Sequence, residues 1–231
     1  MFWRDVAAIA IGYLLGSANF AHMIARLRKG IDLRSVGDGN VGARNVWHVV
    51  APFWGTVASV LDGLKGMAVV LLARALGASL AGQLGAGPAA MLGHCFPVWL
   101  RFRGGKGVAT LAGVLLVWTP WSSLVALGLV GVSQILMRNM DRAIPVGAIA
   151  SIFLPPVFGY PWTMMLYALG LFALVGLKKL LDLPHERRVW ASAGWQDVRS
   201  NDWYPGLQAG QGQDEAAAHQ NGAAPPGTRG I

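Results

Sequence analysis

Residues 52–74 read PFWGTVASVLDGLKGMAVVLLAR, a stretch that is apolar along almost its whole length. Only Asp62, Lys65 and the terminal Arg74 carry charge. An α-helix needs about 20 predominantly apolar residues to span the hydrocarbon core of a bilayer. The stretch therefore predicts a transmembrane helix, and with it a membrane protein.

Two ionisable residues interrupt this predicted helix near its middle. Asp62 and Lys65 are three positions apart, so they share one helix face and can form an ion pair. Ionisable groups at membrane depth are costly to bury, and they are therefore candidates for a functional role. A structural clamp between helices is the equally weighted alternative for the pair.

The rest of the chain has the same apolar character. Its 231 residues are 54% hydrophobic and only 13% charged, whereas a soluble domain has about 25% charged residues. The other apolar segments are 5–25, 83–100, 107–118, 120–137, 143–158 and 160–177. We predict an all-α integral membrane protein with about seven transmembrane helices.

The distribution of Lys and Arg predicts how these helices are oriented. If the N-terminus is outside, the inside segments are 26–51, 101–106, 138–142 and 178–231. These segments hold every Lys and Arg except Arg4, Lys65 and Arg74. Because cytoplasmic loops collect Lys and Arg, the N-terminus is expected outside and the C-terminus in the cytoplasm. The same effect accounts for much of the net charge of +8, and nothing suggests nucleic-acid binding.

Three regions are expected along the chain. Residues 1–180 form the transmembrane domain, and residues 181–204, basic and then rich in Trp, lie along the cytoplasmic interface. Residues 205–231 are mostly Gly, Ala, Gln and Pro, cannot bury enough apolar surface to fold, and are expected to be disordered. The single cysteine, Cys95, lies in an apolar run and is expected to be buried.

The first basic loop contains GDGNVGARN at residues 37–45, preceded by Asp32 and Arg34. The match to the dinucleotide pattern G-x-G-x-x-G is only formal, because that pattern requires a preceding strand. Glycine-rich backbone and Asn side chains can instead donate hydrogen bonds to phosphate oxygens. A flexible loop without a ligand is the alternative. The candidate ligands are Arg34, Gly37, Gly39, Asn40, Gly42 and Asn45.

The second basic loop, Gly104-Gly105-Lys106-Gly107, opens a predicted helix at Val108. A helix N-terminus presents unpaired N–H groups and a partial positive charge, which suit an anion. The loop lacks the spacing of the Walker pattern. A turn that is basic only because it faces the cytoplasm is the alternative. Two such loops on one side of a membrane protein predict that it handles phosphate-bearing molecules at the membrane surface.

Two further polar residues lie within apolar segments. His94 has no partner in the sequence and is more typical of a hydrogen-bonded residue in a helix bundle than of a ligand, and Ser17 faces the bundle or serves as a small packing residue. No spacing typical of metal ligands occurs, so we expect no metal site. We also find no Ser/His/Asp arrangement and expect no cofactor.

Taken together, these motifs resemble the acyl-phosphate–glycerol-3-phosphate acyltransferase family of bacterial inner membranes, the PlsY family. The resemblance covers about residues 10–115 and includes the order and spacing of the motifs. The matching motifs are Gly16-Ser17, Asp32-Leu33-Arg34, residues 37–45, Asp62-Gly63-Leu64-Lys65-Gly66, Gly93-His94-Cys95-Phe96-Pro97 and Phe102-Arg103-Gly104-Gly105-Lys106-Gly107-Val108-Ala109-Thr110.

The resemblance implies seven transmembrane helices with an active site facing the cytoplasm. It implies acyl transfer from acyl phosphate to glycerol 3-phosphate, giving lysophosphatidic acid for phospholipid synthesis, with membrane lipids as neighbours and no cofactor. By the same resemblance, Lys106, Arg34 and Asn45 are the expected catalytic residues. The expected substrate-binding residues are Ser17, Gly37, Gly39, Asn40, Gly42, Asp62, Lys65, His94, Gly104, Gly105, Gly107 and Thr110.

The sequence also departs from the family pattern. Asp38 and Arg44 replace a Ser and a Thr of the first motif, and His48 and Asn19 replace an Arg and a Pro. Pro145 stands where a later serine is expected, and the C-terminal motif H-x-x-N-I-x-R-L is not recognisable. Two alternatives therefore stay open. The protein could bind or move phosphate esters or phospholipids without catalysis, or it could acylate a different acceptor.

Overall fold

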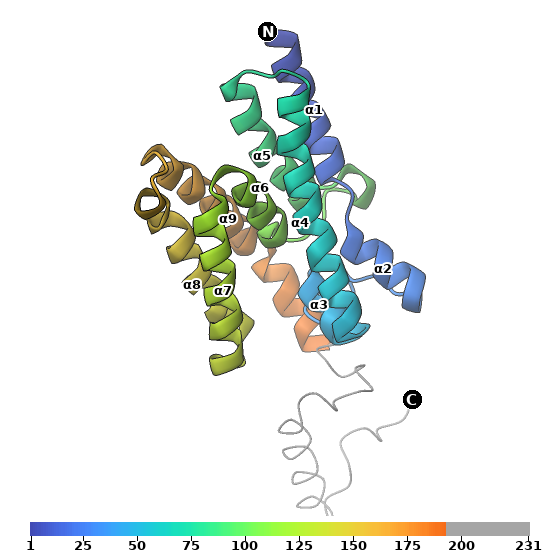
Figure 1. Cartoon of the computed structure of the whole chain (residues 1–231). Coiled ribbons are helices and arrows are strands. Elements are labelled where there is room, and N and C mark those ends of the chain that lie inside the picture. Colours follow the sequence, from blue (N-terminus) through green and yellow to red (C-terminus); the bar gives the residue numbers. More distant parts are fainter. Residues whose placement is uncertain (193–231) are drawn as a thin grey trace, which may run out of the picture. The chain divides into compact units, whose positions relative to one another are not determined.

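The computed structural model describes residues 1–192, and every regular element in that part of the chain is helical (Figure 1). The predicted all-α fold is therefore confirmed. The α-helices and short 3₁₀-helices are α1 (Phe2–Gly16), α2 (Phe20–Lys29), α3 (Ala43–Val49), α4 (Pro52–Ala75), α5 (Leu80–Cys95), η1 (Val98–Leu100), α6 (Val108–Trp118), α7 (Pro120–Met137), α8 (Met140–Phe153), η2 (Pro155–Phe158) and α9 (Thr163–Ser192).

Within residues 1–192, 4 helical stretches are long and apolar enough to cross a membrane. They are Phe2–Lys29, Pro52–Ala75, Pro120–Met137 and Thr163–Ser192. The other predicted segments form the shorter helices α5, α6 and α8. The count of seven spans and the orientation of the termini therefore stay predictions.

The first apolar segment is broken where the sequence suggested one continuous helix. Helix α1 ends at Gly16, and α2 begins at Phe20 with Asn19 as its N-cap. The Asn19 side chain accepts a hydrogen bond from the backbone N–H of His22 at 2.9 Å, which satisfies one of the donors left free at a helix start. The break at Ser17–Asn19 turns α2 away from the direction of α1 (Figure 1).

The central helices approach each other through small residues. A Cβ atom on Gly16 of α1 would collide with the Ala90 carbonyl group of α5, and one on Gly113 of α6 would collide with the Gly63 carbonyl group of α4. Such close backbone packing is common between membrane helices, because lipid gives no hydrophobic drive for their association. Helices α1, α4, α5 and α6 consequently form a tight core.

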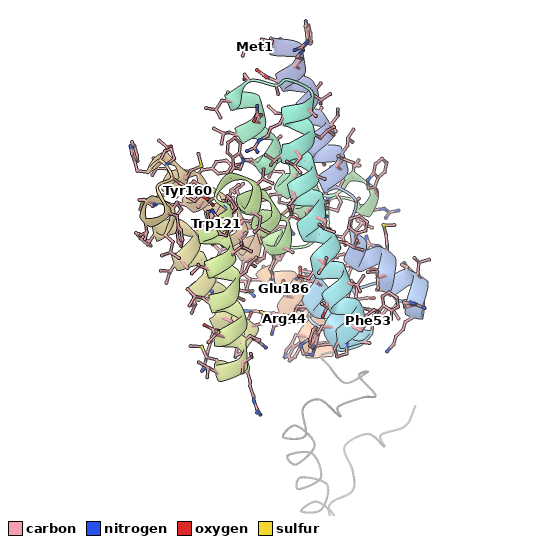
Figure 2. All side chains as sticks on the ribbon, viewed as in Figure 1. Met1, Arg44, Phe53, Trp121, Tyr160 and Glu186 are labelled. Carbon is pink, nitrogen blue, oxygen red and sulfur yellow. The ribbon has the colours of Figure 1, made fainter. Side chains whose placement is uncertain are left out.

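Large apolar side chains are exposed around this core. Ile135 and Leu136 on α7 and Leu180 on α9 expose 75%, 77% and 64% of their surface. Soluble monomers rarely expose large contiguous apolar surface, whereas a bilayer solvates it. Phe53 and Trp121, labelled in Figure 2, expose a further 66% and 63% of their surface. These exposed apolar side chains agree with a membrane location.

Helix α9 continues through the boundary expected at residue 180 and ends at Ser192. The start of the expected interfacial segment is therefore helical, and its location at the membrane interface stays a prediction. Residues 193–204 and the expected disordered tail at 205–231 lie outside the described residues. Cys95 is buried, as its apolar surroundings predicted.

Candidate active site

The first glycine-rich loop is organised by a buried amide. Asn45, on the first turn of α3, is fully buried. Its Nδ2 atom donates to the carbonyl oxygens of Leu33, Val36 and Asn40 at 3.1, 2.9 and 3.0 Å. Because a buried polar group must be hydrogen-bonded, these contacts fix the path of the loop. The amide group of the predicted catalytic Asn45 thus lies inside the loop that it shapes.

The backbone of this loop requires glycine at two points. Gly37 and Gly39 have φ of 60° and 68°, a region that side-chain-bearing residues rarely adopt. Between them, the Asp38 carboxylate accepts a hydrogen bond from the Asn40 backbone N–H at 3.0 Å. Burial raises the pKa of the Asp38 carboxyl, against the opposing effects of this hydrogen bond and of the Lys106 charge. Asp38 therefore closes a local turn, which a serine hydroxyl can also do.

Arg34 is held in place by a bidentate ion pair with Asp32. The Arg34 Nε and Nη2 atoms lie 2.9 and 2.6 Å from Asp32 Oδ1 and Oδ2. These hydrogen bonds lower the pKa of the Asp32 carboxyl to about 2, despite its partial burial. The remaining Arg34 Nη1 atom donates to the Leu100 carbonyl oxygen at 3.3 Å, which links the first loop to η1.

The second loop folds back on the end of α5. The backbone N–H groups of Gly104 and Gly105 donate to the carbonyl oxygens of Cys95 and His94 at 3.1 and 3.2 Å. The N–H groups of these two predicted ligands are therefore hydrogen-bonded to the protein backbone. Gly107, with φ of 79°, is the N-cap of α6. The N–H groups at the start of α6 are then the part of this loop best oriented for an anion.

The two loops touch each other. A Cβ atom on Gly105 would lie 2.7 Å from the Val41 carbonyl oxygen of the first loop and would also collide with the His94 ring. The same Val41 oxygen accepts a hydrogen bond from Asn19 Nδ2 at 3.2 Å. The sequence suggested two separate anion loops, and the structure brings them into direct contact.

Lys106 projects from the second loop to α9. Its Nζ atom lies 2.7 Å from Glu186 Oε1, and the other carboxylate oxygen of Glu186 lies 3.4 Å from Lys179 Nζ. Also on α9, His185 Nε2 lies 3.1 Å from the Arg34 carbonyl oxygen. Figure 2 shows Glu186 and Arg44 at the end of the helical unit away from Met1.

His185 and Glu186 could not be assigned a role from the sequence, because the expected C-terminal motif is not recognisable there. The helical spacing of the residues along α9 would have indicated both. On α9, Lys178 is buried, and His185, Glu186 and Val189 contact the two loops, so these residues recur at roughly helical spacing.

A buried ionic cluster lies next to the second loop. Lys65 Nζ lies 2.6 Å from Asp62 Oδ1 and 3.0 Å from His94 Nδ1. Lys65 Nζ also donates to the Ala18 carbonyl oxygen at 2.6 Å. The predicted ion pair between Asp62 and Lys65 is confirmed. His94, for which the sequence suggested no partner, contacts Lys65 in this cluster.

The remaining predicted residues lie at the edges of this region. The Ser17 hydroxyl donates to the Tyr13 carbonyl oxygen at 2.9 Å, so it closes the last turn of α1. Thr110 is fully buried, and its backbone carbonyl lies against Gly66 at the contact of α4 and α6. A cavity of about 370 Å³ lies between the helix break and η1. Its lining consists of Ser17, Ala18, Asn19, His22, Met23, Trp99 and Leu100.

Fold and site together define a class of protein: an all-helical membrane protein with two touching, basic, glycine-rich loops beside a buried ionic cluster. The chain belongs to the glycerol-3-phosphate acyltransferase family, whose model matches residues 6–181. This confirms the family that the sequence motifs indicated.

Individual members of this family are also similar to the chain. A glycerol-3-phosphate acyltransferase of Desulforudis audaxviator (strain MP104C) is 40% identical over 178 residues, which cover 75% of this chain and 87% of the relative. One of Anaeromyxobacter dehalogenans (strain 2CP-C) is 38% identical over 177 residues, which cover 71% and 86%. The alignments thus span most of both chains.

Two solved structures are also similar. Both are crystal structures of PlsY (YgiH), an integral membrane glycerol 3-phosphate acyltransferase. The glycerol 3-phosphate form is 33% identical, has a TM-score of 0.69, and covers 78% of this chain and 90% of its own. The lysophosphatidic acid form is 31% identical, has a TM-score of 0.66, and covers the same shares of 78% and 90%.

Proposed function

We propose that this protein acylates glycerol 3-phosphate at the membrane and takes the acyl chain from an acyl phosphate. The 1-hydroxyl oxygen of glycerol 3-phosphate attacks the acyl carbonyl carbon and forms an ester. The bond between that carbon and the phosphate oxygen breaks, and the hydroxyl proton leaves with the released phosphate. The products are lysophosphatidic acid and inorganic phosphate. Because acyl phosphate is already activated, no covalent enzyme intermediate is required.

The contact between the two glycine-rich loops carries this proposal. Both substrates bear phosphate, so the reaction needs two anion sites whose ligands come within bonding distance. Gly105 of the second loop packs against Val41 of the first, and Arg34 and Lys106 bring one positive charge from each loop. Holding two reactants side by side can supply a large part of an enzymatic rate enhancement.

Each loop has a distinct part in the proposal. Lys106 and the N–H groups at the start of α6 hold the acyl phosphate and offset the charge that develops on the carbonyl oxygen and leaving phosphate. Arg34 orients glycerol 3-phosphate with the amide of Asn40, whose Oδ1 atom is buried without a protein partner in the described structure. Asn45 maintains the shape of the first loop through three hydrogen bonds from its Nδ2 atom. Its Oδ1 atom, also buried without a partner in the described structure, helps to orient glycerol 3-phosphate.

The contacts of two family departures support glycerol 3-phosphate as the acceptor. Asp38 replaces a serine but makes a turn hydrogen bond that serine can make. Arg44 replaces a threonine, and its Nη1 atom lies 2.7 Å from Asp141 Oδ1 on α8. Both side chains therefore have structural partners inside the protein, which favours tolerated variation over a changed acceptor.

The proposal includes the bacterial inner membrane, seven spans, an outside N-terminus and a site facing the cytoplasm. The distribution of Lys and Arg supports this orientation. Cys95 is the only cysteine in the sequence and is buried, so a maleimide should label only a cysteine added by mutation. A membrane-impermeant maleimide should label Ala75→Cys in intact cells, and Ser35→Cys only after the membrane is opened. The reverse pattern would overturn the orientation.

The identity of the donor is tested by offering two activated acyl groups. Purified protein should form lysophosphatidic acid from palmitoyl phosphate and glycerol 3-phosphate, with the product identified by mass. Palmitoyl coenzyme A, at the same concentration, should give at least tenfold less product, because it lacks the acyl phosphate group that Lys106 is proposed to bind. Equal rates, or faster transfer from the coenzyme A ester, would refute the donor assignment.

A further inference from the structure

The Glu186 carboxylate lies where Lys106 meets α9. Its Oε1 atom is 2.7 Å from Lys106 Nζ, and its Oε2 atom is 3.4 Å from Lys179 Nζ. The Glu186 and Lys106 side chains expose only 11% and 15% of their surface, whereas Lys179 exposes 43%. Glu186 therefore has two alternative cationic partners, one mostly buried at the site and one open to solvent.

Neighbouring contacts fix the part of α9 that carries Glu186. His185 lies 3.1 Å from the Arg34 carbonyl oxygen, and the Val189 side chain lies against Gly39, where an added Cβ would come within 3.0 Å. Both contacts are to the first glycine-rich loop. Glu186 points from this anchored turn to the second loop, so its approach to Lys106 is set by the fold.

The chemistry of this pair resembles that of a bound substrate. A lysine ammonium group that is largely removed from water requires a countercharge, and a carboxylate and a phosphate both supply anionic oxygens to it. A phosphate group carries up to two negative charges and three acceptor oxygens, so it can compete with a single carboxylate. A phosphate that binds Lys106 therefore competes with Glu186 for the charge of the ammonium group.

We infer that Glu186 is an internal substitute for the substrate phosphate, which holds Lys106 in the empty site and sets how strongly the site binds phosphate groups. When phosphate arrives, Lys106 exchanges partners, and Glu186 keeps Lys179 as its countercharge. The inference uses the proposed role of Lys106 as the phosphate ligand. The shared chemistry is the phosphate group itself, either on the acyl donor or as the free product.

This role of Glu186 predicts the direction in which phosphate affinity changes when its charge is removed. A ligand that needs a free Lys106 binds with an intrinsic affinity reduced by the fraction of molecules in which Lys106 is free. Removing the Glu186 charge should therefore strengthen phosphate binding. A residue that instead orients Lys106 for the substrate would have the opposite effect, because its loss would leave the ammonium group misplaced.

The test measures binding of inorganic phosphate to the full-length protein in detergent by isothermal titration calorimetry. Glu186→Gln should lower the dissociation constant by about tenfold, as expected if about one molecule in ten has a free Lys106. Glu186→Asp, whose carboxylate is one methylene shorter, should shift it in the same direction by less. A thermal unfolding transition establishes that each variant is folded. If Glu186→Gln does not fold, the comparison of Glu186→Asp with wild type decides the test.

The matched control is Asp141→Asn, which removes one negative charge from an exposed pair with Arg44 and does not contact Lys106. Its phosphate affinity should stay within about twofold of wild type, as expected for a surface ion pair. Unchanged or weaker binding in folded Glu186 variants would overturn the inference, and so would equal strengthening in the control. Because the readout is binding, tighter phosphate binding without any acyl transfer would sustain this inference and refute the proposed reaction.

Discussion

The Nζ atom of Lys65 lies 2.6 Å from the carbonyl oxygen of Ala18, at the break between α1 and α2. A carbonyl group at the end of a helix has no partner within the helix, so it needs one from elsewhere. Lys65 supplies that hydrogen bond, and Asp62 supplies the charge that Lys65 needs. These contacts support the clamp interpretation of the pair, because each charged group has an oppositely charged partner inside the protein.

Breaking this clamp should destabilise the fold. Lys65→Met leaves buried Asp62 with only the His94 ring, 3.5 Å away, so it should lower the free energy of unfolding by about 3–5 kcal/mol. The double variant Asp62→Leu/Lys65→Met removes both charges and should recover part of that loss. Denaturant unfolding in detergent micelles measures both. A single variant as stable as wild type would show that the pair is not a clamp.

Lys106→Ala should abolish acyl transfer, with a loss of about 100-fold or more, because it removes the charge proposed to face the leaving phosphate. Lys179→Ala is the matched control, since Lys179 also contacts Glu186 but is largely exposed. It should lose far less activity than Lys106→Ala, because it weakens phosphate binding only indirectly, through Glu186. The measurement is the initial rate with palmitoyl phosphate for proteins of equal unfolding temperature. Wild-type rates in folded Lys106→Ala would exclude the proposed role.

Gly105→Ala should damage the contact between the loops. Its Cβ would lie 2.7 Å from the Val41 carbonyl oxygen and would collide with His94, so the loops must separate. We expect a loss of about 1–3 kcal/mol in stability, as for overpacked sites, together with a lower rate of transfer. Gly128→Ala on α7 meets nothing within 4 Å and should be neutral or stabilising. Similar behaviour of the two variants would contradict the tight contact.

The Asp32–Arg34 pair should make stability depend on pH in one acidic window. The pKa of Asp32 is lowered from 3.8 to about 2 in the folded protein by its hydrogen bonds to Arg34. Its ionised form therefore contributes stability above pH 3.8, and this contribution is lost as the pH falls through about 2. The stability difference between wild type and Asp32→Asn should be constant from pH 7 to 5 and then shrink. A difference that disappears by pH 5 would contradict the pairing.

Much of this structure could be predicted from the sequence, because long apolar segments and the placement of Lys and Arg are local signals. Such local signals predicted the helices, the ion pair of Asp62 and Lys65, and the family motifs. The break at Ser17–Asn19 was missed, because Ser-Ala-Asn in an apolar run resembles a small-residue packing face. The contact of Glu186 with Lys106 joins residues 80 positions apart and lies outside any motif, so only the packing of α9 reveals it.

The most direct test of the central claim is phosphate release from palmitoyl phosphate by the purified protein, with and without glycerol 3-phosphate. We predict release that depends on glycerol 3-phosphate and yields one lysophosphatidic acid, identified by mass, for each phosphate. No release from folded protein that still binds acyl phosphate would contradict the account. Such a result would favour a protein that binds or moves phosphate esters without acyl transfer.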